Sequence, residues 1–234
     1  MIKTNYIIAT WNGVRVKPVD QLYYEDVLKN HLQILLNTKH NLSQITIMRP
    51  YNDLENGYYT IDGYGDVKII GCKNEYQSYG QWLKAVEIYL DNFDYFIFIE
   101  DDYVPNVDNF DTKLIDIYKE GSYLCSTVSG SGDNAHCAIS NGIISNNTIR
   151  NLITKIKYNQ WLDNFSSKNL ELVFNGTNHQ RAFSRYLAEN GITLVDYRND
   201  YMVDYYANGI FTDFSISNPL NNQKIFTPIQ NIIK

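Results

Sequence analysis

The feature that most restricts the fold of this chain is the run from Asp94 to Asp102, in which five apolar residues are enclosed by acids. Residues Tyr95 to Ile99 are aromatic or β-branched. A short apolar run of this kind is typical of a strand buried on both faces, as in the middle of a parallel sheet. Because such a sheet must be covered on both sides, the run indicates an α/β fold.

Three carboxylates, Glu100, Asp101 and Asp102, follow this strand directly. Like charges this close repel one another, so each must stay hydrated or find a cation. A hard divalent cation such as Mg²⁺ or Mn²⁺ would relieve the repulsion, and a diphosphate is its usual further ligand. The alternative is a solvated acidic loop or the start of a helix. Pro105 argues against a helix that begins at once, and ligands bind at the carboxyl ends of strands in open α/β sheets.

The first hundred residues alternate between apolar strands and amphipathic helices. Strands are expected at 6–10, 45–48, 67–70 and 95–99, and helices at 22–36 and 79–90. This alternation is typical of βαβ units and predicts a mostly parallel central sheet flanked by helices. Right-handed crossovers would place the loops after Thr10 and Ile99 at one sheet edge. His31 lies on the apolar face of the first helix, where a packed, hydrogen-bonded histidine is expected rather than a ligand.

The second half of the chain has a different pattern. Helices are expected at 112–119, 149–156 and 178–190, and strands at 123–128, 136–144 and 193–195. Gly142 interrupts one of these strands, and a glycine there permits the close approach of a ligand or of another backbone. From residue 196 onward the sequence shows no clear period, so this tail is expected to be a lid or to wrap the domain.

Composition excludes several classes of protein. The 234 residues suggest one large domain or one and a half small ones, and a net charge of −6 argues against a nucleic-acid backbone as partner. No dinucleotide fingerprint and no P-loop is present. No apolar run approaches 18 residues and no signal peptide is recognisable, so no transmembrane segment is expected. Three widely spaced cysteines indicate reduced, mostly buried thiols and a cytoplasmic location.

From Ile7 to Val195 the order of these parts resembles the GT-A class of nucleotide-sugar-dependent glycosyltransferases. The likeness is to family-2-like enzymes and to the small ones of bacteria and large DNA viruses. Residues 95–102 look like the strand that ends in the DxD motif of that class, with Glu in the first position. The resemblance implies that Asp102 binds Mn²⁺ or Mg²⁺ and that Glu100 makes the second contact.

The resemblance also implies two groups of substrate-binding residues. Nucleotide contacts are expected from Thr10, Trp11, Asn12 and Asp101, with Tyr79 and Trp82 as aromatic rings that stack on the base or the sugar. The acceptor side is expected along the small-residue strand, at His136, Ser140, Asn141 and Gly142.

One departure from the family pattern concerns the general base. The Glu-Asp pair that the family carries before a spaced Arg falls here on Asn178 and His179, so no carboxylate is present. A neutral imidazole is a competent base near pH 7, and His179 is therefore one candidate. Asp133 in the Gly/Ser loop is a second candidate. A third alternative is an enzyme without a base at this position, which retains configuration.

The resemblance implies a single GT-A-like domain, with a nucleotide-binding half at 1–104, an acceptor half at 105–195 and a wrap or lid at 196–234. The expected activity is metal-dependent transfer of a sugar from a nucleotide diphosphate sugar, by family frequency a UDP-sugar, to a hydroxyl of a glycan, with inversion. One rival is a sugar nucleotidyltransferase, although Arg15 and Lys17 lack the glycines of a triphosphate loop. The other is a non-catalytic sugar- or nucleotide-binding domain.

Overall fold

The structure, a computed structural model, describes residues 1–10, 24–50, 57–60, 67–72, 77–129, 135–155, 177–197 and 201–204. Strands and helices alternate through the first hundred residues, as the sequence predicts. The strands are β1 (Thr4–Ala9), β2 (Gln44–Pro50), β3 (Gly57–Thr60), β4 (Val67–Cys72), β5 (Tyr95–Glu100), β6 (Tyr103–Pro105), β7 (Ser122–Ser129), β8 (His136–Ser145), β9 (Thr193–Asp196) and β10 (Met202–Asp204). The helices are α1 (Tyr24–Asn37), α2 (Gln77–Tyr89), α3 (Phe110–Ile117), α4 (Asn146–Lys155) and α7 (Thr177–Glu189).

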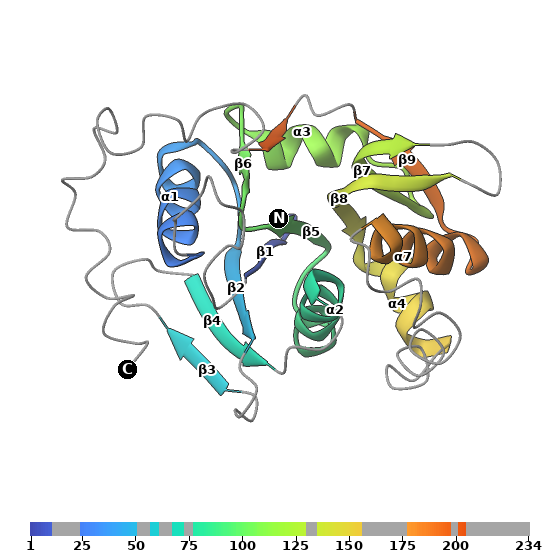
Figure 1. Cartoon of the computed structure of the whole chain (residues 1–234), viewed down its shortest axis with the longest axis horizontal. Helices are drawn as coiled ribbons and strands as arrows, with labels where there is room; N and C mark the ends of the chain where they lie inside the picture. Colours follow the sequence, from blue (N-terminus) through green and yellow to red (C-terminus); the bar gives the residue numbers. More distant parts are fainter. Residues whose placement is uncertain are drawn as a thin grey trace.

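Eight of these strands form one sheet in the order β3-β4-β2-β1-β5-β8-β7-β9 (Figure 1). Its centre, β4-β2-β1-β5, is parallel throughout. β3 runs antiparallel to β4, β8 runs antiparallel to both β5 and β7, and β9 lies parallel to β7. β5, which forms from the apolar part of the run from Asp94 to Asp102, is therefore internal, as its composition predicts, and the α/β expectation is confirmed.

The two faces of the sheet carry separate hydrophobic clusters, because successive side chains of a strand point to opposite faces. In β1, Tyr6 and Ile8 belong to the cluster that includes the apolar residues of α1 and α3. Ile7 and Ala9 belong to the other cluster, which includes residues of α2, α4 and α7. Helices thus cover both faces (Figure 1). Burial on both sides explains why the central strands read as continuous apolar runs.

A second, two-stranded sheet was not expected from the sequence. β6 follows the acidic residues directly and pairs antiparallel with β10. Met202 lies opposite Pro105, and Asp204 lies opposite Tyr103. The Asn106 N–H donates to the Tyr201 carbonyl over 2.9 Å and extends the contact. The beginning of the tail therefore packs beside the residues that leave β5.

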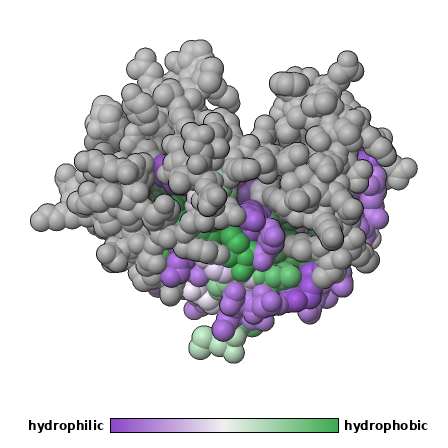
Figure 2. Space-filling model, turned by 90° about the horizontal axis from the view of Figure 1, so that it is seen from below, coloured by the Kyte–Doolittle hydropathy of each residue, from purple (hydrophilic) through white to green (hydrophobic). Residues whose placement is uncertain are grey.

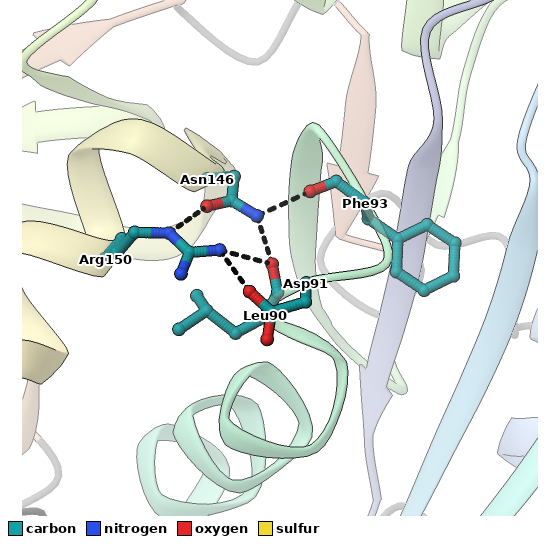
Figure 3. Close-up of polar contacts among 5 residues, drawn as sticks. All are labelled: Leu90, Asp91, Phe93, Asn146 and Arg150. Atoms are coloured by element: carbon teal, nitrogen blue, oxygen red, sulfur yellow. Dashed lines mark hydrogen bonds and ion pairs between the residues drawn. The ribbon is translucent and has the colours of Figure 1, made fainter.

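At the amino ends of the parallel strands, Asn146 joins α4 to the turn between α2 and β5 (Figure 3). Its Nδ2 donates to the carbonyls of Leu90 and of Phe93, the latter over 2.8 Å. Arg150, one turn later, donates from Nε to Asn146 Oδ1 over 3.1 Å and forms an ion pair with Asp91 over 2.6 Å. These contacts fix α4 at the edge of the sheet opposite to the acidic residues.

The described surface is mostly hydrophilic on the face drawn in Figure 2. Among the described residues, the large apolar side chains left exposed are Met1, Ile2 and Ile117. No helix in the described ranges is both long enough and apolar enough to cross a membrane. The three cysteines are free and buried, as expected.

Candidate functional site at the carboxyl edge of the parallel strands

The order of the parallel strands reverses between β1 and β5. From β1 the chain moves outward to β2 and β4, and then returns to the other side of β1 as β5. Ala9, the last residue of β1, lies opposite Glu100, the last residue of β5. The predicted meeting of the two strand ends at one sheet edge is therefore confirmed. Such a switch point is where ligands bind in open α/β sheets.

Residues Glu100, Asp101 and Asp102, which we call the acidic turn, lie at this point. The side chains of Glu100 and Asp102 are partly exposed, whereas Asp101 is only 6% exposed. The two outer carboxylates therefore face solvent, and the middle residue faces the protein.

Buried side chains of α2 and β8 hold the backbone where β5 meets the acidic turn. Trp82 of α2 donates from Nε1 to the carbonyl of Ile99 over 3.1 Å. The Glu100 N–H donates to Asn141 Oδ1 over 2.8 Å. The β5-β8 ladder ends at the pair Phe98 and Gly142, so the Asn141 side chain supplies the acceptor that the ladder no longer provides.

The carbonyl of Asp101 accepts a hydrogen bond over 3.0 Å from Nδ1 of His31, which lies on α1. The other ring nitrogen, Nε2, lies 2.8 Å from the Tyr6 hydroxyl. His31 is fully buried, and burial lowers its pKa to about 4, although the bond to Asp101 acts in the opposite direction. The imidazole is therefore neutral at pH 7, and the prediction of a packed, hydrogen-bonded histidine is confirmed.

Two polar residues of α2 complete the edge. Ser78 Oγ donates to Oε1 of Glu100 over 2.7 Å and so restrains that carboxylate. Gln81 forms two bonds with the backbone of Thr10. Its Oε1 accepts from the Thr10 N–H, and its Nε2 donates to the Thr10 carbonyl, each over 2.9 Å. One helix therefore holds the ends of both β1 and β5.

Sequence reasoning did not identify Ser78 or Gln81. The available signal was their spacing, because Ser78, Gln81 and Trp82 share one face in the first two turns of α2. Polar residues on the inward face of an otherwise apolar helix indicate a polar partner in the protein.

Thr10, predicted to contact the nucleotide, is buried and bonded within the protein. Besides its bonds with Gln81, its Oγ1 donates to the carbonyl of Met48 over 2.8 Å. Thr10 thus fixes the end of β1 at this edge of the sheet. Trp11 and Asn12, the next two predicted nucleotide contacts, lie outside the described residues. The side chain of Asp101 is buried as well, and its nucleotide contact stays a prediction.

Tyr79 and Trp82 require a correction. Their side chains are 3% and 0% exposed, so neither ring presents a face to a nucleotide. Trp82 stacks on Phe98, with ring centroids 5.4 Å apart and planes 5° apart. Tyr79 packs against Trp82 and against Phe183 of α7. Both rings belong to the hydrophobic core. Trp82 contributes to the site by its hydrogen bond to the Ile99 carbonyl, which fixes the end of β5.

Of the predicted acceptor-side residues, two have structural roles in the protein and two have side chains that the structure does not describe. Asn141 is fully buried behind the acidic turn rather than on an open surface. A Cβ on Gly142 would lie 2.3 Å from the carbonyl oxygen of Leu124, so the glycine admits the backbone of β7 and not a ligand. His136 and Ser140 lie on β8, but their side chains are outside the described set, and their roles stay predictions.

The roles of the two candidate bases, His179 and Asp133, stay predictions. His179 is the third residue of α7. This helix ends just before β9, which is parallel to β7 and starts at the amino edge of the central strands, so its first turn lies towards the carboxyl edge. The His179 side chain and the whole of Asp133 lie outside the described residues.

The donor chemistry of the acidic turn suits a divalent cation that is shared with a substrate. In the described ranges no group of three or more His, Cys, Asp and Glu side chains could hold a metal by itself. Mg²⁺ is ordinarily bound by one or two carboxylates, with substrate phosphates and water as the other ligands. Glu100 and Asp102, both partly exposed, provide two such carboxylates.

The fold is similar to that of the glycosyltransferase GlyE from Streptococcus pneumoniae TIGR4, with a TM-score of 0.51 at 12% sequence identity. The similarity covers 92% of this chain and 50% of GlyE, so the chain spans about half the length of that protein. The apo form of GlyE has a TM-score of 0.49 at 15% identity, over 95% of this chain and 53% of GlyE.

A third structure, 4-diphosphocytidyl-2C-methyl-D-erythritol synthase from Anaerococcus prevotii, has a TM-score of 0.47 at 12% identity, over 90% of this chain and 93% of that one. The sequence matches no protein-family model and no curated protein. The expected resemblance is thus confirmed at the level of the fold: this chain has a GT-A-like α/β fold.

Proposed function

We propose that this chain is a glycosyltransferase that moves a sugar from a nucleotide diphosphate sugar to a hydroxyl group of a glycan. The observation that carries the proposal is the acidic turn, which places two partly exposed carboxylates at the switch point of a GT-A-like sheet. Four side chains fix the turn and its first carboxylate. Rigid support of this kind is expected where charged groups must act in a fixed geometry.

In this proposal Asp102 holds Mn²⁺ or Mg²⁺, and Glu100 lies beside it as the second contact. Such a cation supplies Lewis-acid stabilisation of the negative charge on the leaving diphosphate. Ser78 keeps Glu100 in one orientation through its 2.7 Å hydrogen bond. Gln81 fixes Thr10, the residue that follows β1, and so supports the end of β1 at the proposed nucleotide site.

The acceptor hydroxyl loses a proton as it attacks the anomeric carbon, and a base must take it. His179 in the first turn of α7 and Asp133 are the two candidates, and either would give inversion by direct displacement. UDP is the first nucleotide to test, followed by GDP and dTDP.

The decisive experiment is calorimetric titration of the protein with each of these nucleotides, in Mn²⁺ and in EDTA. We expect one nucleotide to bind in Mn²⁺ and at least about tenfold more weakly in EDTA. Asp102→Asn, which keeps the shape of the side chain and removes its charge, should reproduce the loss in Mn²⁺. Asp116→Asn is the matched control, because Asp116 is an exposed acid on α3.

Turnover then separates the classes of function. Release of the nucleoside diphosphate from the matching nucleotide sugar supports a transferase or, without acceptor, a hydrolase side reaction. Release of pyrophosphate from a nucleoside triphosphate and a sugar phosphate would indicate a nucleotidyltransferase instead. Binding without either reaction would indicate a non-catalytic domain. Absence of binding for all three nucleotides would contradict the proposal and leave the acidic turn without a donor-binding role.

A further inference from the structure

We infer that His31 is a positioning residue for the acidic turn, which it holds by a buried hydrogen bond from α1 to the carbonyl of Asp101. The inference rests on the proposed function, because it assigns His31 to the donor site without any contact to the donor. His31 lies on the opposite face of the sheet from α2, so it supports the turn from the side that Trp82 does not reach.

The bonds of His31 define its tautomer. A backbone carbonyl can only accept, so Nδ1 carries the hydrogen that is donated to Asp101 over 3.0 Å. Nε2 is then an acceptor, and it takes the hydrogen of the Tyr6 hydroxyl over 2.8 Å. The Asp101 carbonyl, both ring nitrogens of His31 and the Tyr6 hydroxyl each have a partner in this chain of hydrogen bonds. Tyr6 belongs to β1, and the chain therefore connects the strand on one side of the switch point to the turn on the other.

Packing alone does not explain a histidine at this position. The neighbouring inward residues of α1 are Leu28, Leu32 and Leu35, all buried. A fourth apolar side chain would fill the space without the desolvation cost of burying a polar ring. The two hydrogen bonds offset the cost of burying the imidazole. The bond to Asp101 holds the backbone between the two partly exposed carboxylates, Glu100 and Asp102.

The place of this bond in the turn is also informative. β5 ends at Glu100, so the Asp101 carbonyl lies beyond the ladder between β1 and β5. Trp82 fixes the Ile99 carbonyl, Asn141 fixes the Glu100 N–H, and His31 fixes the next carbonyl. The directions of the Glu100 and Asp102 side chains follow from the backbone that these bonds hold. Loss of the His31 bond would release the end of the turn that carries Asp102.

Two substitutions at His31 separate this role from packing. His31→Asn keeps an N–H donor close to the place of Nδ1, because both nitrogens are attached to Cγ, and loses the bond to Tyr6. His31→Leu is apolar and loses both bonds. Tyr6→Phe loses the bond to His31 alone. Asn146→Ala, at the opposite edge of the sheet, is a control for loss of stability without any change at the turn.

The first readout is the dissociation constant of UDP in Mn²⁺, or of whichever of UDP, GDP and dTDP binds the unaltered protein, measured well below each variant's melting temperature. We expect His31→Leu to weaken binding by about tenfold. His31→Asn, Tyr6→Phe and Asn146→Ala should stay within about threefold of the unaltered protein. Equal loss in the Asn and Leu variants, or a loss that simply follows melting temperature through all four variants, would overturn the inference.

The second readout needs no nucleotide. Amide hydrogen exchange of residues 99–104 should accelerate in His31→Leu and stay close to the unaltered rate in His31→Asn, while peptides from α7 and β9 exchange alike in both. Unchanged exchange in His31→Leu would show that the hydrogen bond from His31 does not hold the acidic turn. If the unaltered protein binds none of the three nucleotides, the proposed function fails, whereas the exchange comparison still decides whether His31 holds the turn.

Discussion

Gly142 shows how a single residue can be misread when only the sequence is known. A glycine inside a strand permits the approach of a ligand or of a backbone, and the sequence does not distinguish the two. The structure does, because Gly142 lies opposite Cys125 and the space for a Cβ is filled by the Leu124 carbonyl and the Tyr123 ring. The glycine is therefore a packing requirement between β7 and β8.

We predict that Gly142→Ala lowers the free energy of unfolding by about 1–3 kcal/mol, because the new methyl group meets a backbone carbonyl that cannot move independently. Urea denaturation at pH 7.5 measures the change. Gly121→Ala is the matched control. Gly121 has a φ of +79° and open space around its Cβ, so its cost is conformational, roughly 1–2 kcal/mol. A Gly142 variant as stable as the unaltered protein would contradict the steric explanation.

The acidic turn illustrates what the sequence could show of the site. The run of apolar residues and the three acids were sufficient to place a buried strand and its polar end, because both signals are local. The bonds from His31, Ser78, Gln81 and Asn141 join residues far apart in the sequence, and no local pattern reports them. The resemblance assigned the aromatic rings of Tyr79 and Trp82 to the nucleotide, whereas their burial depends on contacts with Phe98 and Phe183.

At the scale of elements, long periodic segments were predictable and short ones were not. The helices and strands with a clear apolar period begin and end within a few residues of their predicted positions. The exceptions are β3, β6 and β10. β3 has four residues and pairs with β4, whereas β6 and β10 have three residues each and pair with one another across the chain. The sequence predicts the start of α3 at residue 112, two residues late. The helix begins after Asn109, whose left-handed backbone conformation could not be foreseen from the apolar pattern.

The contact of α4 with the turn before β5 allows a prediction at this scale. Asn146→Ala removes two hydrogen bonds to backbone carbonyls and one from Arg150 (Figure 3). We expect it to lower the free energy of unfolding by about 1–3 kcal/mol, because the Phe93 and Leu90 carbonyls lose the Asn146 donor, although Leu90 keeps the 3.4 Å bond from Arg150. Arg150→Ala should cost less than about 1 kcal/mol, because the Arg150 and Asp91 side chains are 42% and 84% exposed.

The measurement is urea denaturation, with thermal melting as a second probe. Because these residues lie at the edge of the sheet opposite to the acidic turn, neither substitution should alter the affinity for nucleotide. An Asn146 variant that lost nucleotide binding at temperatures where it is folded would show that the two edges are coupled.

At the scale of the whole molecule, the buried His31 makes the stability of the fold depend on pH. In the folded protein its pKa is lowered to about 4, mainly by burial, whereas an unfolded chain has the ordinary value of 6.5. Above pH 6.5 the imidazole is neutral in both states and has no effect. Between 6.5 and about 4 the unfolded chain binds a proton that the folded protein excludes, so stability falls as the pH falls.

The full loss, reached below about pH 4, is on the order of 3 kcal/mol. Tyr6, the partner of His31, stays neutral throughout this range, because burial raises its pKa well above the ordinary value. Carboxylates also titrate here, so the comparison is with His31→Asn, which has the same carboxylates. We expect the unaltered protein to lose more free energy of unfolding than His31→Asn between pH 7.5 and pH 4, as measured by urea denaturation. Parallel pH profiles would mean that the histidine accepts a proton without unfolding, and that the hydrogen bond that Nε2 accepts from the Tyr6 hydroxyl is not required by the fold.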